Sequence, residues 1–525
     1  MEAISIFGRK IEEMIPKRID VYANYELIGH QSPELELHGG MLAFCLANGD
    51  FKEGLNVTYT MVIDRQGNIA ALRWGDSYSY EGELYSRHYE ALKPFNSSTL
   101  LMIAHDTKNE SVNHPSNRIL LWDFVTGNEE FVPYNGSQSL DDHDIQYLPQ
   151  TDSFLVQEET SETSRLINWC QTTRENLWVL DFRDLDIPDQ LFQSGMHINK
   201  FQMVNDNLLM ANSRNQGIIY LIHIDDTGNS AIIARYGGLS SDAEFYDLAG
   251  NHVSQLWERF THNTEVFFHL NEESASAPHT FVTYDNNAGW NGSISTTRFL
   301  EFRCKTENHQ LICHETWVWE TGDKSSIFGD ADYTPSGNIL GPSWGTYADP
   351  SDPNQQGYHC HIFEVNKAKG VAWSLNVKPY WLSWMGSNPT EAYPRHNEEA
   401  PIGWSLYSVE NIYSEPIIKN LAWDYASDIL RFIAFNTHRT SHISPALVRL
   451  YSEFNTLIKS KKIELNKMWI PTQVEIDVSD PTIFQLLEIS SHMYVELENE
   501  WGYVSRKKII VKHNTNPNQW HYLKA

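Results

Sequence analysis

Short strand-like segments recur along most of this chain, and many are followed by a polar turn and a second such segment. Examples are TYTMVID, RILLWDFV, GIIYLIHI and CHIFEV, which mix β-branched, aromatic and aliphatic residues as strands do. The turns carry Gly, Asn or Asp, residues that tolerate the positive φ values tight hairpins often need. The pattern therefore predicts an all-β fold.

Two kinds of hairpin alternate between residues 31 and 440. An inner hairpin such as FQMVNDNLLMANSR ends near polar residues, and an outer hairpin such as HIDDTGNSAIIARYG follows it. The outer turns are irregularly spaced, but they recur at an average typical of propeller blades, roughly 40–60 residues. They lie near Asp64, Asp123, Asp181, Asp226, Cys304 and Glu364. The unit recurs too often for one sandwich, so we predict a β-propeller of about six blades.

The two ends of the chain follow other patterns. Residues 1–30 are expected to form an N-terminal extension, with a possible amphipathic turn broken by Pro16. Residues 441–525 alternate at period two, as in TQVEIDVS and MYVELENEW, which predicts a small β-sandwich. The predicted organisation is thus an extension, a propeller over 31–440 and a C-terminal sandwich.

Charge and hydropathy limit the partners. The 525 residues include 39 Lys+Arg and 68 Asp+Glu, a net charge of −29, which argues against nucleic-acid binding through bulk charge. No run of about 18 apolar residues occurs, so no membrane span is expected. The start lacks a signal-peptide pattern, which leaves a cytoplasmic protein or a mature secreted form open. A few local Arg and His side chains can still bind a small anion.

Cysteine and histidine spacing gives little evidence for metal. Cys304 and Cys313 flank a turn between two strand-like runs, so a disulfide across a hairpin and two buried thiols are about equally supported. His359 and His361 share one face of a strand, but two ligands are too few, and an ordinary strand is expected. No P-loop, GxGxxG, HExxH or GxSxG motif occurs, so neither a nucleotide cofactor nor a metal is predicted.

Polar residues near the ends of inner hairpins are the candidates for a site, because a propeller gathers these ends around its central channel. His143 lies in LDDHDIQYLP. His197 and Asn199 are two residues apart, so they share one strand face, and Arg214 ends the hairpin that begins there. A strand-end cap for His143 and an ion pair of Arg214 with Asp206 are the structural alternatives.

The next inner hairpin supplies three further candidates. His262 opens it, and Asp285 with Asn286 closes it. We count Asp285 and Asn286 among the substrate-binding residues, with the shaping of a turn as the favoured structural alternative.

The ordered set HDIQYLP, MHINKFQMVNDNLLMANSRNQGIIYLI, THNTEVFF and TYDNNAG, within about residues 140–345, resembles the arylsulfotransferases. The resemblance implies a six-bladed propeller enzyme with its site in the central channel. Such an enzyme moves a sulfuryl group from an aryl sulfate to a phenol through a sulfohistidine, without a nucleotide donor.

The resemblance also implies roles for single residues. By position, His262 would be the nucleophile, a role that neutral imidazole suits near pH 7. His197, Asn199 and Arg214 would bind the sulfuryl oxygens, which need fixed donors as charge develops. His143 would transfer protons to the leaving phenolate and from the accepting phenol.

The chain departs from the family pattern at Thr261, where Gln is usual, at Lys200, where a small hydroxyl residue is common, and in DNNAG. These departures keep two other functions open. One is a hydrolase or lyase that uses the same pocket on another small anion. The other is a propeller that binds without catalysis, which predicts that the candidate side chains do not converge.

Overall fold

A computed structural model describes most of the chain. The described residues are 19–24, 40–48, 57–75, 77–80, 83–88, 91–106, 118–134, 136, 140–159, 164–192, 195–225, 228–253, 259–268, 278–288, 296–325, 327–349, 352–377, 404–424, 427–480, 483 and 491–510. They fall into two compact units: the first ends at Glu410, and the second consists of the residues from Asn411 onward together with residues 40–41 and Pro94–Ser98. Among these residues, no helix has the length and apolar character that a bilayer span requires.

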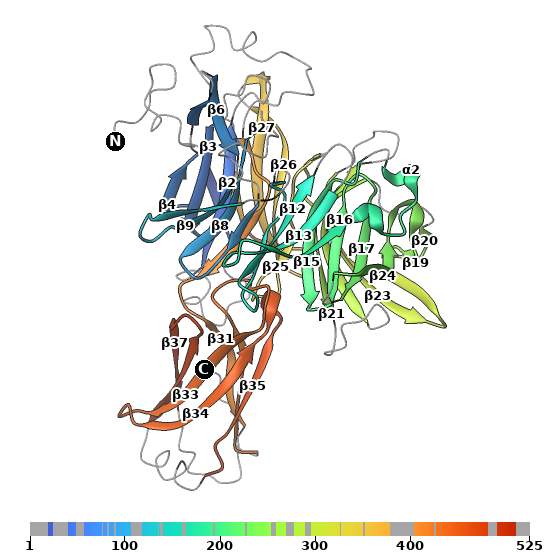
Figure 1. The fold of residues 1–525 in the computed structure, drawn as a ribbon. Coiled ribbons are helices and arrows are strands. Elements are labelled where there is room, and N and C mark those ends of the chain that lie inside the picture. The colour runs from blue at the N-terminus through green and yellow to red at the C-terminus, as the bar shows by residue number, and fades with distance from the viewer. Residues whose placement is uncertain are drawn as a thin grey trace. The chain divides into compact units, whose positions relative to one another are not determined.

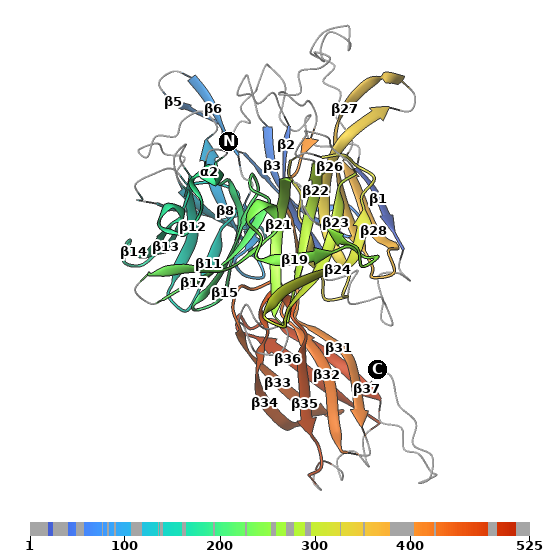
Figure 2. The same cartoon turned by 90° about the vertical axis from the view of Figure 1, so that its right-hand side faces the viewer.

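Six sheets form the first unit, as the strand labels of Figures 1 and 2 let the reader follow. The first sheet contains β2 (Gly40–Asn48), β3 (Val57–Asp64), β4 (Ile69–Trp74) and β29 (Trp404–Ser405). The second contains β5 (Ser77–Tyr80), β6 (Glu83–His88), β7 (Leu92–Pro94), β8 (Thr99–Asp106), β9 (Arg118–Asp123) and β10 (Glu129–Pro133).

The middle of the chain forms two regular four-stranded blades. The third sheet runs through β11 (Gln146–Leu148), β12 (Ser153–Glu159), β13 (Ser164–Cys170) and β14 (Asn176–Asp181) in sequence order. The fourth runs likewise through β15 (Ile198–Asn205), β16 (Leu208–Ser213), β17 (Ile218–Ile224) and β18 (Ser230–Tyr236). Short helices η2 (Phe182–Asp184), α2 (Asp189–Phe192) and η3 (Gly238–Ser240) lie in the connections.

The last two sheets carry longer strands. The fifth contains β21 (Arg259–Phe268), β22 (His279–Ala288), β23 (Arg298–Glu307) and β24 (Gln310–Glu320), extended by β19 (Ala243–Tyr246) and β20 (His252–Val253). The sixth contains β25 (Asp332–Tyr333), β26 (Ile339–Asp349), β27 (Asp352–Val365), β28 (Val371–Val377) and β1 (Ile19–Ala23). The predicted six-bladed all-β propeller is confirmed by this arrangement.

Segments from both ends of the propeller complete blades formed by the opposite end. β1 pairs with β28, with Ile19 opposite Val377 and Ala23 opposite Trp373. β29 pairs with β2. The prediction of a separate extension over residues 1–30 is therefore wrong for 19–23, which form a blade strand, while the expected turn at Pro16 lies outside the described residues.

Neighbouring blades pack face to face through apolar side chains that alternate along the strands. Leu155 and Leu166 of the third sheet share a core with Tyr220 and Ile222 of the fourth. The opposite face of the fourth sheet packs in the same way on Phe281 and its neighbours in the fifth. Because the fourth sheet is covered on both faces, the inner ends of its strands are held at fixed positions.

Outer hairpins are closed by a local device that the sequence encodes. Asp64 accepts hydrogen bonds from the backbone N–H of Gln66 and Asn68 at 2.9 and 2.8 Å, and Gly67 supplies a φ of +86°. Asp225 and Asn229 repeat the pattern before β18. The turn predicted near Asp181 is wrong, since that residue ends β14 and the β13–β14 turn covers 171–175.

Cys304 and Cys313 lie directly opposite each other on β23 and β24 and form a disulfide. Of the two alternatives that the sequence left open, the disulfide is therefore the one present.

The second unit is a β-sandwich. One sheet contains β31 (Ile417–Asp424), β32 (Ile429–Phe435) and β35 (Thr472–Asp477). The other contains β33 (Ser444–Ser452), β34 (Leu457–Leu465), β36 (His492–Asn499) and β37 (Val504–Ile510), and η4 (Lys467–Trp469) precedes β35. Val448, Val474 and Val495 belong to the core that the two sheets share. The predicted boundary at 441 is too late, because β31 pairs with β32 and β32 pairs with β35, so both strands belong to the sandwich.

Candidate functional site

Four of the sequence-predicted side chains lie together in the propeller. The rings of His143 and His197 are 4.6 Å apart between centroids. His143 precedes β11, His197 precedes β15, and Arg214 follows β16, where its backbone N–H donates to the His197 carbonyl at 3.0 Å. His262, within β21, is close enough to His197 to lower its pKa. Three adjacent blades therefore meet at one polar cluster.

Burial and neighbouring positive charge keep the His197 ring neutral. Burial is the largest cause, followed by His143, Arg214 and His262, and together they lower the pKa of His197 to about 2. Burial also lowers the pKa of Arg214 to about 10, so its guanidinium stays protonated at neutral pH. The pair thus offers one neutral imidazole and one cation to an anionic group.

His262 is oriented by Asn286 of the neighbouring strand β22. The His262 Nδ1 atom lies 2.5 Å from Asn286 Oδ1, and Asn286 Nδ2 donates to the carbonyls of Ser325 and Phe328 at 3.0 and 3.1 Å. Because the amide nitrogen faces two carbonyls, the amide oxygen must face the imidazole. Nδ1 therefore carries the proton, and its N–H donates a hydrogen bond to Asn286 Oδ1. The lone pair of the ring is left on Nε2, as a nucleophile requires.

Asp141 orients His143 in a similar way. Its Oδ1 atom lies 2.6 Å from His143 Nδ1 and also accepts the His143 backbone N–H at 3.0 Å. A carboxylate at Nδ1 fixes the tautomer and stabilises the imidazolium, so proton exchange with a ligand falls to Nε2.

Tyr407 is a site residue that the sequence did not reveal. Its ring lies 5.6 Å from that of His143, 6.0 Å from that of His262 and 5.8 Å from that of Phe328. It precedes β30 (Val409–Tyr413), in a stretch that carries no motif. Tyr407 and Phe328 add an aromatic wall to the histidine cluster.

Asn199 does not take the substrate-binding role that the resemblance implied. Its Nδ2 atom donates to the Thr261 carbonyl at 2.9 Å, and Asn212 donates to its Oδ1 atom at 2.6 Å. Thr261 in turn donates its hydroxyl to Asn212 at 3.0 Å. Asn199 is therefore a positioning residue that ties β15 and β16 to the strand of His262. Thr261, a departure from the family pattern, is part of the same network.

Asp285 is likewise placed away from the predicted role. It forms an ion pair with Arg298 at 2.8 Å and accepts the backbone N–H of Asn287 at 2.8 Å. These contacts stabilise the β22–β23 pairing, whereas the neighbouring Asn286 contacts His262. The turn-shaping alternative describes Asp285 better than substrate binding does.

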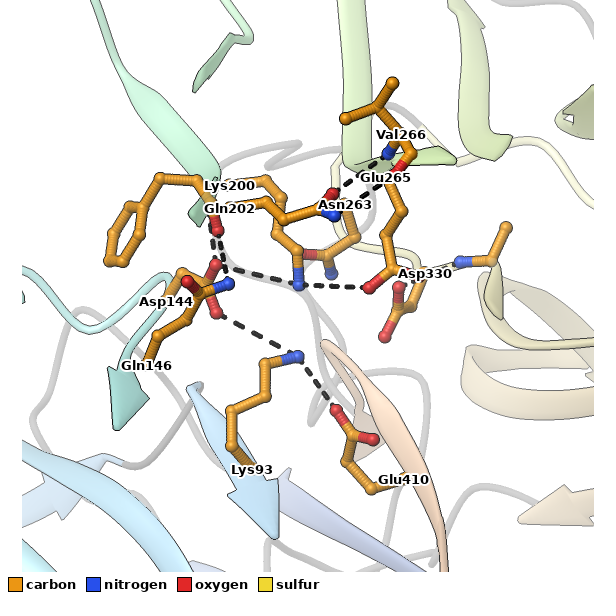
Figure 3. Close-up of polar contacts among 12 residues, drawn as sticks. Lys93, Asp144, Gln146, Lys200, Gln202, Asn263, Glu265, Val266, Asp330 and Glu410 are labelled. Carbon is orange, nitrogen blue, oxygen red and sulfur yellow. Dashed lines mark hydrogen bonds and ion pairs between the residues drawn. The ribbon is translucent and has the colours of Figure 1, made fainter. Parts of the chain in front are cut away.

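Buried ion pairs support the inner strands, as Figure 3 shows. Lys200 Nζ lies 3.6 Å from Asp144 and 3.8 Å from Glu265, and all three side chains are buried. Lys93 bridges Asp144 and Glu410 at 3.9 and 2.8 Å. Lys200, another departure from the family pattern, thus links three blades through ion pairs.

Two glutamine side chains join β11 to β15 and β15 to β21 through hydrogen bonds to the backbone of the neighbouring strand. Gln146 donates to the Phe201 carbonyl at 2.9 Å and accepts the Met203 N–H at 3.0 Å. Gln202 makes the equivalent pair of bonds to the backbone of Val266, at 3.1 and 2.9 Å. These paired bonds fix the spacing between the blades that carry His143, His197 and His262.

Within the part of the chain that the structure describes, two clusters present three metal-ligating side chains each, with donor atoms within 4.8 Å. One is Asp141, Asp142 and His143, which belongs to the site above. The other is Asp323, His359 and His361. The sequence paired His359 with His361 but gave no signal that Asp323 joins them, because Asp323 comes from another blade connection. The expectation of an ordinary strand there is therefore incomplete.

The carboxyl of the second cluster is held in its ionised form by its two histidine neighbours. Burial raises the pKa of Asp323, but hydrogen bonds from His359 and His361 outweigh it and hold that pKa well below its usual range. Burial lowers the pKa of His359. A carboxylate thus lies against two imidazoles, a combination that suits a metal as well as a hydrogen-bonded triad.

Comparison with known proteins adds only a weak structural likeness. No family model matches the chain, and no curated protein matches it. Among solved structures, the chain is similar to the periplasmic gluconolactonase PpgL of Pseudomonas aeruginosa, at 9% identity and a TM-score of 0.29. That match covers 82% of this chain and 99% of the other.

Proposed function

We propose that this protein is an aryl sulfotransferase that carries the sulfuryl group on His262. The observation that supports it most strongly is the orientation of His262, whose Nδ1 is held by Asn286 at 2.5 Å, which leaves Nε2 as the reactive atom. The resemblance to arylsulfotransferases names the same residue as nucleophile. The proximity of His197 and Arg214 adds donors for an anionic group.

In the first half-reaction, His262 Nε2 attacks the sulfur of an aryl sulfate. The N–S bond forms as the S–O bond to the aryl group breaks, and the leaving phenolate takes a proton from His143. Arg214 and the N–H of neutral His197 stabilise the charge that develops on the sulfuryl oxygens. Asp141, 2.6 Å from His143 Nδ1, stabilises the imidazolium that donates the proton.

In the second half-reaction, a phenol occupies the position that the first product has left. His143, now neutral, accepts the phenol proton while the phenol oxygen attacks sulfur and the N–S bond breaks. One histidine thus serves as acid and then as base, and His262 returns to its starting tautomer. No cofactor or nucleotide is consumed.

Substrate class follows from the surroundings of the histidines. The rings of Tyr407 and Phe328 provide an apolar face for an aryl group, while Arg214 attracts its sulfate. The chain as a whole carries a net charge of −29, so this local cation acts against the general charge of the surface.

The test is a transfer assay with an aryl sulfate donor and a phenol acceptor, using wild type, His262→Gln and His252→Gln. His252 is exposed on β20, so its variant is a matched control for the loss of an imidazole. We expect the aryl sulfate of the acceptor as product from wild type and control, and at least a 1000-fold slower rate from His262→Gln.

The same assay separates the alternatives. Inorganic sulfate as product, with the acceptor unchanged, would indicate a hydrolase that uses the same pocket. No turnover of any aryl sulfate, together with saturable binding, would favour a binding platform. Equal rates for His262→Gln and wild type would exclude the histidine mechanism.

A further inference from the structure

A cluster of Asp323, His359 and His361 lies outside the proposed sulfuryl site. His359 and His361 are two residues apart on β27, so both rings project from one face of that strand, with centroids 4.1 Å apart. Asp323 belongs to the connection that follows β24. The cluster therefore brings a carboxylate from one blade onto two imidazoles of the next.

Asp323 contacts each imidazole with a different oxygen. Its Oδ1 atom lies 3.3 Å from His359 Nε2, and its Oδ2 atom lies 3.0 Å from His361 Nδ1. Tetrahedral coordination with bonds of about 2.0–2.1 Å places neighbouring ligand atoms about 3.3 Å apart. These two separations are close to those between neighbouring ligands of a tetrahedral site, and one donor atom from each of the three side chains lies within 4.8 Å of the other two.

The backbone of the adjacent strand leaves room for this carboxylate. Gly345 of β26 pairs with His359, and a Cβ atom at Gly345 would lie only 2.8 Å from Asp323 Oδ1. Any other residue at position 345 would thus displace the carboxylate. The glycine at position 345 therefore leaves the room that the Asp323 carboxylate occupies.

We propose that Asp323, His359 and His361 bind a divalent transition-metal ion, with the remaining coordination positions open to water or to an anion. Two imidazoles and one carboxylate suit Zn²⁺ or Fe²⁺, whereas Ca²⁺ and Mg²⁺ prefer oxygen ligands alone. The ion can enter from the side of His361, whose side chain is 21% exposed, while Asp323 and His359 are 10% and 7% exposed.

The site has a structural link to the histidine cluster. Thr297 donates its backbone N–H to the Asp323 carbonyl at 2.9 Å, which anchors the connection that also contains Ser325 and Phe328. The carbonyls of those two residues hold Asn286. A bound ion would therefore stabilise the segment that supports Asn286, whatever reaction the protein catalyses.

The test is Zn²⁺ binding to the full chain after chelator treatment, followed by calorimetry and by metal analysis of the dialysed protein. We expect wild type to bind one more equivalent of Zn²⁺ than Asp323→Asn, or to bind that equivalent at least about 100-fold more tightly. His309→Gln, which removes an exposed imidazole from the β23–β24 turn, should behave as wild type. Zn²⁺ at Asp141, Asp142 and His143 would be the same in all three proteins.

Stability provides the second readout. Zn²⁺ should raise the Tm of wild type and of His309→Gln by more than it raises that of Asp323→Asn, and Ca²⁺ should produce no such difference. Should Asp323→Asn fail to fold, His361→Gln replaces it, because that side chain is partly exposed. Equal Zn²⁺ stoichiometry and affinity in wild type and a folded variant would show that the triad is only hydrogen-bonded and would overturn the proposal.

Discussion

The buried neutral His197 makes the stability of this protein depend on pH in a specific direction. Its pKa is about 2 in the folded chain, against an ordinary value of about 6.5 in the unfolded chain. Between these values the unfolded state binds a proton that the folded state does not, so acid favours unfolding. Stability therefore falls as the pH drops below about 6.5, and the loss continues down to about pH 2.

The expected size follows from the shift itself. The value of pH 5 lies about 1.5 units below the ordinary pKa of histidine. Protonation of this residue in the unfolded state therefore lowers the free energy of unfolding by about 2 kcal/mol relative to pH 7. His197→Asn removes the titrating group. Because His197 has a φ of +47°, and Asn tolerates this left-handed conformation, the substitution keeps the backbone unstrained.

Urea unfolding of both proteins between pH 5 and pH 7 measures the effect. The free energy of unfolding of wild type should fall by about 2 kcal/mol more than that of His197→Asn over this range. His309→Asn is the control, since His309 also has a positive φ, +68°, but lies exposed in a turn. Parallel curves for wild type and His197→Asn would refute the buried, neutral state of His197.

Two further substitutions test the supports of the site. Asn286→Ala removes the hydrogen bond to His262 and two hydrogen bonds to backbone carbonyls. In stopped-flow and steady-state assays, kcat for the proposed sulfuryl transfer should fall about 100-fold while KM changes little. A rise in KM as large as the fall in kcat would argue against a positioning role. Lys200→Met leaves Asp144 and Glu265 without their shared cation and should cost about 3–5 kcal/mol in urea unfolding. Adding Glu265→Gln should recover part of that loss, and no recovery would contradict the ion-pair assignment.

Local patterns were sufficient to predict the class of fold. Alternating apolar residues and Asp-x-x-Gly-Asn turns such as that at Asp64 act over a few residues, so hairpins and their order are visible in the sequence. The same locality explains the placement of His197 and Arg214. They stand at the two ends of one hairpin, and pairing of β15 with β16 brings them together without information from elsewhere.

Long-range pairing is what the sequence did not reveal. β1 pairs with β28 and β29 pairs with β2, across more than 300 residues, so a short strand near either end looks like an extension or a loop. The domain boundary was misplaced for a related reason. β31 and β32 have the alternation of another outer hairpin, and only the pairing of β32 with β35 assigns this hairpin to the sandwich.

Side-chain partners were the other gap. Tyr407 lies beside His143 and His262 because the chain returns to the site just before β30. The sequence around Tyr407 contains no motif that indicates this position. Asn199 and Asp285 were placed at the right strand ends, but the identity of their partners, Thr261 and Arg298, depends on rotamers and neighbouring strands. Spacing along one strand could not supply either partner.

Intact-protein and peptide mass spectrometry after brief exposure to an aryl sulfate tests the central proposal most directly. A sulfohistidine mechanism predicts an adduct of roughly 80 Da in the absence of an acceptor phenol, located on His262, labile in acid and lost when the phenol is added. Measurable turnover without any such adduct, or an adduct of that mass on another residue in both wild type and His262→Gln, would contradict it.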